Sequence, residues 1–515
     1  MREVADLKLK KDKKRLSAQS IFLFALVILM YSPFAGISSM YGMVGDTAIQ
    51  IRLGLDDLAS GHLITDEIYS WHENLVFTAH ECGWYLLLGI MYKLLNIWGV
   101  IAVGTVFTYA TGITTVRYSA DRINPFIIAF VIIATPFLNG YPDYNVRPAV
   151  TSIFASALLM VTLIGDRKSL FKAVLFASLC FVLGWMHGGT LPLFFVVYGV
   201  FVVMELLYKE FRGALIMIAG AAAGFILSLL NPIGIRCYTF GLKQSGATDI
   251  WAYVDEWGPM RFNFLQLILI ALVFIGFATG DGIRKFDKKT LTKLGLLTMF
   301  LIMTCVYKRF VAYFSVAYLL FAPEQYKALV SWLCNNVIKP KKELKLQLSD
   351  SFYKILAAVC GVMLIGLGAF YIPTYLPTGT MADIEKMAAY DPAAVEFIKD
   401  RGYGKIFNSF DTGSWLAFHG VRVHIDNRID PFMSEFSGED HIRGQMSVGS
   451  LSDLDNFRDR YDNDAFLVNI SVDDNYLVDE INTYAEDRYR IVYDNTVDSS
   501  VPGVSSIRWL IIECI

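Results

Sequence analysis

Charged residues are scarce in this sequence. Asp, Glu, Lys and Arg make up 18% of its 515 residues, whereas hydrophobic residues make up 55%, and the mean hydropathy is +0.46. The surface of a soluble protein needs more charge than this. Apolar runs close to the length of a bilayer span recur along the chain, so the composition predicts a multi-pass membrane protein.

Several patterns that mark other protein classes are missing. The seven cysteines show no Cys-x-x-Cys or Cys/His spacing, so neither a zinc site nor a disulfide framework is expected. The sequence has no P-loop for ATP-driven transport, no His-Glu-x-x-His for a metalloprotease and no Gly-x-Ser-x-Gly for acyl transfer. No basic stripe lies outside the flanks of the apolar segments, so no nucleic acid partner is expected. The first apolar segment has no small-residue cleavage site and is expected to stay as an anchor.

Charge divides the chain into three parts. Residues 1–17 are basic and, by the positive-inside rule, are expected in the cytoplasm. Residues 18–376 carry the apolar segments and form the predicted membrane domain. From Met381 onward there are 25 Asp and Glu against 12 Lys and Arg, a net charge of −13 that leaves +10 for the rest. Residues 377–515 are therefore predicted to form an acidic extracytoplasmic domain.

The fold class predicted by these patterns is a polytopic α-helical membrane protein of about 11 transmembrane helices, in the plasma membrane, with a small C-terminal α/β domain. Basic loops alternate with outer loops almost throughout. The predicted spans are residues 18–38, 97–116, 125–139, 149–165, 170–186, 190–208, 213–230, 263–280, 291–306, 310–322 and 355–376. In the tail, short strands alternate with helices. The predicted strands are residues 405–408, 421–425, 466–470, 489–493 and 507–513, and the predicted helices are residues 393–400, 453–460 and 477–486.

The first outer loop, residues 39–96, is unusually acidic. Between Gly45 and Trp84 it holds seven Asp and Glu but a single Arg. Asp46 lies where an outward span meets an amphipathic helix that Gly61 is expected to end, which makes Asp46 the leading candidate for a general base. The same residue also suits the N-cap of that helix, and the two roles are compatible.

A second helix in this loop is predicted to begin at Thr78, because Thr-Ala-His-Glu has the spacing of a capping box. Glu81 is then either a second catalytic acid or the capping partner of Thr78. His80, on the same turn, is expected either to contact the substrate or to face water.

Cations on the outer side form the candidate phosphate site. Asp143 and Arg147 fall in the short outer loop YPDYNVRP, where Arg147 either grips a phosphate with its planar fork or pairs with Asp143. Lys308 and Arg309 separate two spans at the outer face, where they suit a lipid-linked phosphate, unless the spans are mispaired and both are cytoplasmic. His187 ends the fifth span beside two glycines and is either a substrate contact or a helix-end histidine.

Several short motifs occur along the chain in a fixed order. They are the Asp after the first span, TAHECGW, YNVRP, GWMHGG, NPIG, the EW before the eighth span, NSFDTGSWLAFHG and VHIDNRIDPF. Together they resemble the GT-C superfamily of multi-pass membrane glycosyltransferases of bacteria. The resemblance implies sugar donors linked to polyprenyl phosphate or diphosphate, and a catalytic acid in the first outer loop, which is Asp46 here. Many members have Asp-Glu or Asp-Asp at this place, so Asp46-Thr47 leaves open a second acid or a divalent metal such as Mg²⁺ or Mn²⁺.

The sequence therefore favours an inverting glycosyltransferase that moves a sugar from a polyprenyl-phosphate-linked donor to an extracytoplasmic cell-wall polymer, glycan or glycolipid. Two other classes stay open. A transporter or flippase of lipid-linked saccharides would use the same cations, although the internal repeats typical of transporters are not found. A non-catalytic scaffold for envelope assembly would have no pocket lined by Asp46 and the cations.

Overall fold

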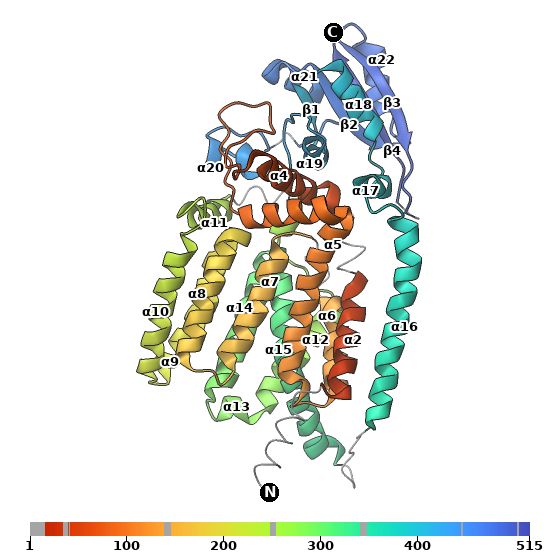
Figure 1. Cartoon of the computed structure of the whole chain (residues 1–515). Helices are drawn as coiled ribbons and strands as arrows, with labels where there is room; N and C mark the ends of the chain where they lie inside the picture. The colour runs from red at the N-terminus through yellow and green to blue at the C-terminus, as the bar shows by residue number, and fades with distance from the viewer. Residues whose placement is uncertain are drawn as a thin grey trace.

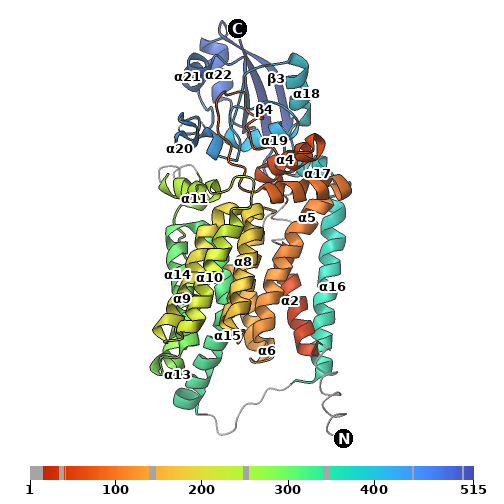
Figure 2. The same ribbon diagram turned by 60° about the vertical axis from the view of Figure 1, so that its left-hand side comes forward.

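The computed structural model describes residues 16–33, 40, 42–138, 146–247, 254–339, 348–443, 446–501 and 504–515. A bundle of long helices stands beneath a smaller α/β domain, and helices of the first loop form a layer between the two (Figure 1). The turned view shows the same three layers, with α16 (Asp350–Tyr375) at the edge of the bundle (Figure 2).

Helices occupy all eleven segments predicted to cross a membrane. They are α2 (Ala18–Pro33), α5 (Cys82–Ala120), α6 (Pro125–Leu138), α7 (Ala149–Ile164), α8 (Ser169–Met186), α9 (Leu191–Leu207), α10 (Phe211–Ser228), α12 (Phe264–Thr279), α14 (Lys288–Val306), α15 (Val311–Leu333) and α16. In the described part of the chain, six helices are long and apolar enough to cross a membrane, and α2, α6, α7 and α12 are apolar but shorter. The predicted helical architecture is confirmed, and the number of crossings stays a prediction.

The first loop lies across the end of the bundle as two packed helices. As predicted, α4 (Asp46–Ser60) ends at Gly61, which has the left-handed φ of 73° typical of a helix end. α5 contains a kink at Asn96 (φ 53°), and its first half lies across the bundle while its second half runs down into it (Figure 1). The two helices touch closely at Gly54, where a Cβ would come within 1.9 Å of the Tyr85 carbonyl oxygen.

The capping box predicted at Thr78 is wrong. α5 begins at Cys82, and Glu81 occupies its N-cap position without a side-chain cap hydrogen bond. The Thr78 N–H donates instead to the carboxylate of Asp430 in the tail, at 3.0 Å. The local pattern fails because a partner 352 residues later in the chain supplies the acceptor.

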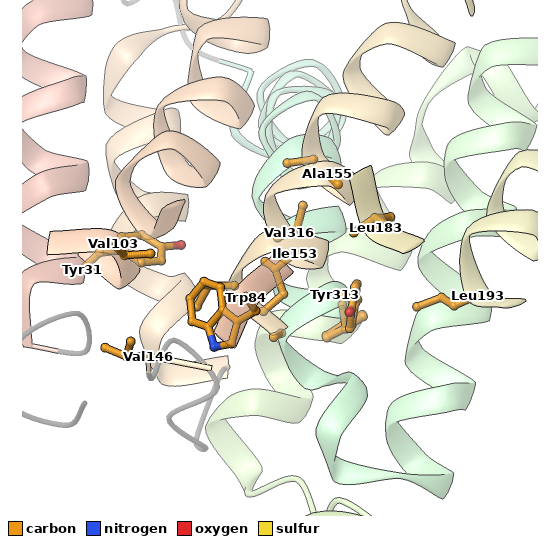
Figure 3. Close-up of a cluster of buried hydrophobic side chains, with 14 of the residues drawn as sticks. Tyr31, Trp84, Val103, Val146, Ile153, Ala155, Leu183, Leu193, Tyr313 and Val316 are labelled. Carbon is orange, nitrogen blue, oxygen red and sulfur yellow. The ribbon is translucent and has the colours of Figure 1, made fainter. Parts of the chain in front are cut away.

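Buried aromatic side chains fill the core beneath the first loop. Trp84, Ile153 and Tyr313 come from α5, α7 and α15 and lie close together (Figure 3). Trp84 is fully buried, and its indole N–H donates to Gln50 Oε1 of α4 at 3.0 Å. Because a buried Trp N–H needs such a partner, this bond fixes the surface helix α4 over the bundle.

The tail forms a mixed sheet with the strand order β1-β2-β4-β3. The strands are β1 (Ile406–Asn408), β2 (Ala465–Ser471), β3 (Tyr489–Val497) and β4 (Ile507–Cys514), with β1 parallel to β2, and β2 and β3 antiparallel to β4. The helices are α17 (Met381–Met387), α18 (Pro392–Arg401), α19 (Phe410–Phe418), α20 (Ser434–Ser437), α21 (Leu451–Tyr461) and α22 (Tyr476–Tyr484). The prediction of a small α/β domain is confirmed.

The strand predicted at residues 421–425 is wrong. Val423 makes one isolated parallel bridge with Ser70 of the first loop. Its N–H donates to the Tyr69 carbonyl oxygen at 2.9 Å, and its carbonyl accepts from the N–H of Trp71 at 3.2 Å. This extended segment therefore bonds to the first loop instead of joining the sheet.

A buried ion cluster holds the tail to the first loop. The side chain of Arg428 is 5% exposed, and its guanidinium contacts Asp426 at 2.6 Å and Glu67 of the loop at 2.5 Å. The same group lies 5.2 Å from the ring centroid of Tyr69 and 4.9 Å from that of Phe77. Buried charges are tolerated only when they are paired, so the tail and the loop depend on each other at this point.

We predict that Glu67→Ala lowers the free energy of unfolding by roughly 3–5 kcal/mol, because it leaves the buried charge of Arg428 incompletely compensated. Thermal unfolding of the purified protein in detergent measures the change. Glu73→Ala removes the same charge from an exposed position of the same loop and is expected to change stability by less than about 0.5 kcal/mol. Equal melting temperatures for the two variants would contradict the role given to the Arg428 cluster.

Candidate active site

A cavity of about 550 Å³ lies between the helical bundle and the tail. Its walls come from α4, the residues before α5, the start of α7 and the junction of α8 and α9, together with two short helices, η5 (Asp255–Trp257) and η6 (Lys308–Phe310), and tail residues 427–430. Six of the sequence-predicted site residues line it, namely Asp46, His80, Glu81, Arg147, His187 and Arg309. Residues from distant parts of the chain therefore meet in one place.

The two other predicted residues stand apart from this set. Asp143 lies outside the described residues. Lys308 belongs to η6, and its backbone N–H donates to the Gly258 carbonyl oxygen at 2.8 Å, but it is not among the described residues that line the cavity. Of the two neighbouring cations at this turn, Arg309 is the one on the cavity wall.

Arg147 lies between two carboxylates from distant segments. It pairs with Asp46 Oδ2 through one nitrogen and donates to Glu256 Oε2 at 2.7 Å through the other. Gly45, not Asp46, is the N-cap of α4, so the Asp46 carboxylate is not used for capping. Burial raises the pKa of Asp46 and the nearby Glu256 adds to this, whereas Arg147 opposes both; the net shift is upward. A carboxylate with a raised pKa is a stronger base.

Glu81 faces two histidines instead of capping a helix. Its Oε1 atom lies 3.3 Å from His80 Nε2 and 3.8 Å from His187 Nε2, and its Oε2 accepts from Gln50 at 3.4 Å. Burial raises the pKa of Glu81, but the charge of His80 and its hydrogen bond to Glu81 outweigh burial, and the net shift is downward. Glu81 is therefore an ionised partner for His80.

His80 is held as an imidazolium. Its Nδ1 lies 2.8 Å from the Thr78 carbonyl oxygen, an acceptor, while its Nε2 faces the Glu81 carboxylate, so both ring nitrogens carry protons. Burial lowers the pKa of His80, but Glu81 and the other acceptors around the ring outweigh it and raise the pKa. The ring also stacks on Phe240, with centroids 3.8 Å apart.

His187 has the opposite charge state. Burial lowers its pKa to about 3, so the ring is neutral. Its Nδ1 lies 2.8 Å from Ser152 Oγ, which in turn lies 2.7 Å from the Tyr313 hydroxyl. This chain of hydrogen bonds fixes the orientation of the ring at the end of α8.

Arg309 supplies a further guanidinium of the cavity, besides Arg147 and the ion-paired Arg428 of the tail. Its guanidinium carbon lies 4.6 Å from the ring centroid of Trp257, which is 5% exposed. Stacking on an indole fixes the plane of a guanidinium and leaves its N–H groups free to bind an anion at their edge. Arg147 and Arg309 together give one cavity two planar cations.

No protein-family model and no curated protein matches this sequence. Among solved structures, the archaeal oligosaccharyltransferase AglB from Archaeoglobus fulgidus, in complex with an inhibitory peptide and a dolichol-phosphate, superposes with a TM-score of 0.52. The match covers 90% of this chain and 70% of that chain at 10% sequence identity. The chain has the fold of this oligosaccharyltransferase. The GT-C fold predicted from the short motifs is thereby confirmed.

Two further structures of the Archaeoglobus fulgidus oligosaccharyltransferase also match. One is in the apo form and has a TM-score of 0.48 at 11% identity, covering 88% of this chain and 70% of that chain. The other is tethered with an acceptor peptide containing the NVT sequon via a disulfide bond and has a TM-score of 0.46 at 12% identity, covering 95% and 74%.

A divalent metal was left open by the sequence, and the carboxylates of the cavity do not fit one. Asp46 and Glu256 hold Arg147 between them, and Glu81 faces His80, so these three carboxylates are each engaged by a positive charge. The part of the chain that the structure describes contains no group of three or more His, Cys, Asp or Glu side chains placed to hold a metal ion.

Sequence reasoning missed Glu256 and the tail residues Asn427 and Asp430, all of which line the cavity. In the sequence, Glu256 is visible only as part of the EW motif before the eighth predicted span. Asp430 is 2% exposed and accepts the Thr78 N–H, and burial raises its pKa to about 7. One signal marks the tail residues in the sequence: acids and an Arg interrupt an apolar segment in VHIDNRIDPF.

We predict that Asp430→Asn stabilises the protein at alkaline pH. The folded state holds the Asp430 proton up to pH about 7, whereas the unfolded chain releases it near 3.8, so wild-type stability falls as pH rises between these values. The raised pKa therefore lowers the free energy of unfolding of wild type by about 4 kcal/mol at pH 8 and by about 1–2 kcal/mol at pH 5. The melting temperature of Asp430→Asn should therefore exceed that of wild type clearly at pH 8 and less at pH 5.

The control for this experiment is Asp66→Asn, which removes an exposed carboxylate and should melt like wild type at both pH values. The assigned shift would be contradicted if Asp430→Asn and wild type differed by the same amount at pH 5 and pH 8.

Proposed function

We propose that this protein is a membrane glycosyltransferase that moves a sugar from a polyprenyl-phosphate-linked donor to an extracytoplasmic acceptor, a saccharide or a lipid. The observation that carries this proposal is the meeting of Asp46, Arg147 and Arg309 in one cavity of an oligosaccharyltransferase fold. The matched oligosaccharyltransferase is in complex with an inhibitory peptide and a dolichol-phosphate. A polyprenyl phosphate is a ligand that suits two planar guanidinium groups.

Donor binding changes the partners of Arg147. Without a ligand, its guanidinium is shared by Asp46 and Glu256. The donor phosphate competes for this guanidinium and for that of Arg309, because an anion accepts from both in a bidentate manner. Asp46 is then released to accept a hydrogen bond from the acceptor hydroxyl.

Transfer proceeds as a single displacement. The acceptor oxygen attacks the anomeric carbon from the face opposite the phosphate, and Asp46 takes the hydroxyl proton. The bond between the anomeric carbon and the phosphate oxygen breaks, and its electron pair leaves with the phosphate, whose charge Arg147 and Arg309 stabilise. Attack from the opposite face inverts the anomeric configuration. Glu81, paired with His80, acts as a positioning residue in this scheme.

The distribution of basic residues indicates which end of the bundle faces the cytoplasm. Basic residues gather at the end of the bundle opposite the cavity, around α13 (Asp281–Arg284) and the start of α14 (Figure 1). The positive-inside rule assigns that end to the cytoplasm. The protein then lies in the plasma membrane with its N-terminus in the cytoplasm, and the cavity and tail outside it.

The cavity favours an enzyme over the two other classes. A scaffold needs no pocket lined by Asp46, Arg147 and Arg309. A flippase of lipid-linked saccharides needs the cations, but it does not need a carboxylate with a raised pKa paired with one of them.

We predict that Asp46→Asn lowers the transfer rate by about 10²–10⁴-fold, because it removes the base while keeping the shape of the side chain. The assay follows the release of polyprenyl phosphate in proteoliposomes supplied with polyprenyl-phosphate sugars and an envelope extract. Asp66→Asn, an exposed change in the same loop, should keep wild-type activity. Wild-type turnover by Asp46→Asn would overturn the assignment of the base.

For the phosphate site, we predict that Arg309→Ala weakens the binding of undecaprenyl phosphate by about ten- to a hundredfold, because a charge-assisted hydrogen bond is lost. Binding to the purified protein in nanodiscs measures this. Arg261→Ala removes an exposed cation nearby in the sequence and should bind like wild type. Equal affinities of the two variants, with equal melting temperatures, would show that Arg309 does not contact the phosphate.

A further inference from the structure

A strained turn from the tail forms one wall of the cavity. The Asp430 N–H donates to the Arg428 carbonyl oxygen at 2.7 Å, which closes a γ-turn with Ile429 at its centre. Ile429 has φ 64° and ψ −58°, a conformation that is strained for a β-branched residue. Such strain persists only where the surrounding structure imposes it, and it concentrates at functional sites.

Contacts on both sides impose this turn. Before it, Arg428 is locked by Asp426 and by Glu67 of the first loop. After it, the carboxylate of Asp430 accepts the N–H of Thr78, also in the first loop. The Ile429 carbonyl accepts the N–H of Phe432 at 2.9 Å. The two loop contacts flank Ile429 and hold its backbone in place.

The turn presents hydrogen-bond acceptors to the cavity. Asn427 Oδ1 and Asp430 Oδ1 are both buried, and within the described part of the protein neither has a hydrogen-bond partner. Both residues line the cavity. A buried acceptor left unpaired destabilises the folded state, so a site that keeps two of them suits a ligand that brings donors.

One of these acceptors lies on the side of the cavity where Asp46, the proposed base, is found. A Cβ built on Gly45 would lie 3.8 Å from Asn427 Oδ1, which places Asn427 beside the residue that precedes Asp46. The phosphate of the donor cannot satisfy these atoms, because it is itself an acceptor and suits the cations Arg147 and Arg309. Sugar hydroxyls are donors, and the aromatic rings of Phe77 and Phe240, which also line the cavity, suit the apolar faces of a sugar ring.

We propose that the tail turn Asn427–Asp430 is a saccharide-binding subsite, in which Asn427 Oδ1 and the Oδ1 atom of ionised Asp430 accept hydrogen bonds from the hydroxyl groups of a sugar bound beside Asp46. This inference rests on the proposed function and adds to it the part of the molecule that recognises the sugar. The tail thus contributes to substrate selection directly.

The test compares two lipids on the full-length protein in nanodiscs: undecaprenyl phosphate, and undecaprenyl phosphate that carries a single hexose or N-acetylhexosamine. Wild type is expected to bind at least one sugar-bearing lipid more tightly than the bare lipid. At pH 8, where Asp430 is ionised, Asp430→Asn replaces an acceptor with a donor without changing the shape of the side chain. It should weaken the binding of the sugar-bearing lipid by about tenfold or more, while the bare lipid binds as before. Asn427→Leu should act in the same direction.

Free methyl glycosides of the same sugars form the second arm of the experiment. If Asp430→Asn changes only the binding of the sugar-bearing lipid, the subsite holds the donor sugar; if it changes only the binding of free glycosides, the subsite holds the acceptor sugar. Asp473→Asn, an exposed carboxylate of the tail, is the matched control and should leave every affinity unchanged.

The proposal is overturned if Asp430→Asn weakens bare and sugar-bearing lipids equally, or if it changes the binding of no sugar. Failure of the proposed function gives a different result. Wild-type turnover by Asp46→Asn together with lost sugar selectivity in Asp430→Asn would refute the reaction and keep the subsite. Because Asp430→Asn is expected to melt at or above the temperature of wild type, lost binding cannot be ascribed to unfolding.

Discussion

The arrangement of this molecule depends on one buried cation. Arg428 contacts Asp426 beside it and Glu67 far away in the first loop, with almost no access to water. None of the three charges is stable there without the others, so the tail cannot leave the loop without exposing or isolating a charge. The tail supplies residues 427–430 to the cavity, and the loop supplies Asp46, His80 and Glu81. The contact that holds the domains together therefore also assembles the site.

A second cation, Arg147, is shared between carboxylates that line the cavity. Among the described residues, Arg147 pairs with two carboxylates, Asp46 from the first loop and Glu256 from η5. In the proposed reaction, an incoming anion competes with Asp46 for this guanidinium, so ligand binding and release of the proposed base are one event. The two histidines differ in charge state: His80 is an imidazolium because Glu81 is its partner, whereas His187 is neutral because burial lowers its pKa.

Local sequence patterns were sufficient to predict the helices and part of the candidate site. Apolar runs bounded by charges predicted the bundle, and Gly61 predicted the end of α4, because these signals act over a few residues. Asp46, Arg147 and Arg309 could be selected as candidates from the sequence, because a charged side chain beside an apolar span costs free energy and usually has a function. Glu256 and Asp430 did not stand out, since their partners lie 109 and 352 residues away. The capping box predicted at Thr78 was wrong for the same reason. The Thr78 N–H donates to Asp430, which lies far away in the sequence.

Chain order gives the Asn427–Asp430 turn one more consequence. All eleven apolar helices precede this turn in the sequence, so the membrane part is synthesised before the last wall of the cavity exists. Until residues 426–430 have docked on the loop, Glu67 has no Arg428 and Thr78 has no Asp430. The newly synthesised bundle therefore carries an incomplete cavity, and docking of the tail on the first loop is the assembly step that completes it.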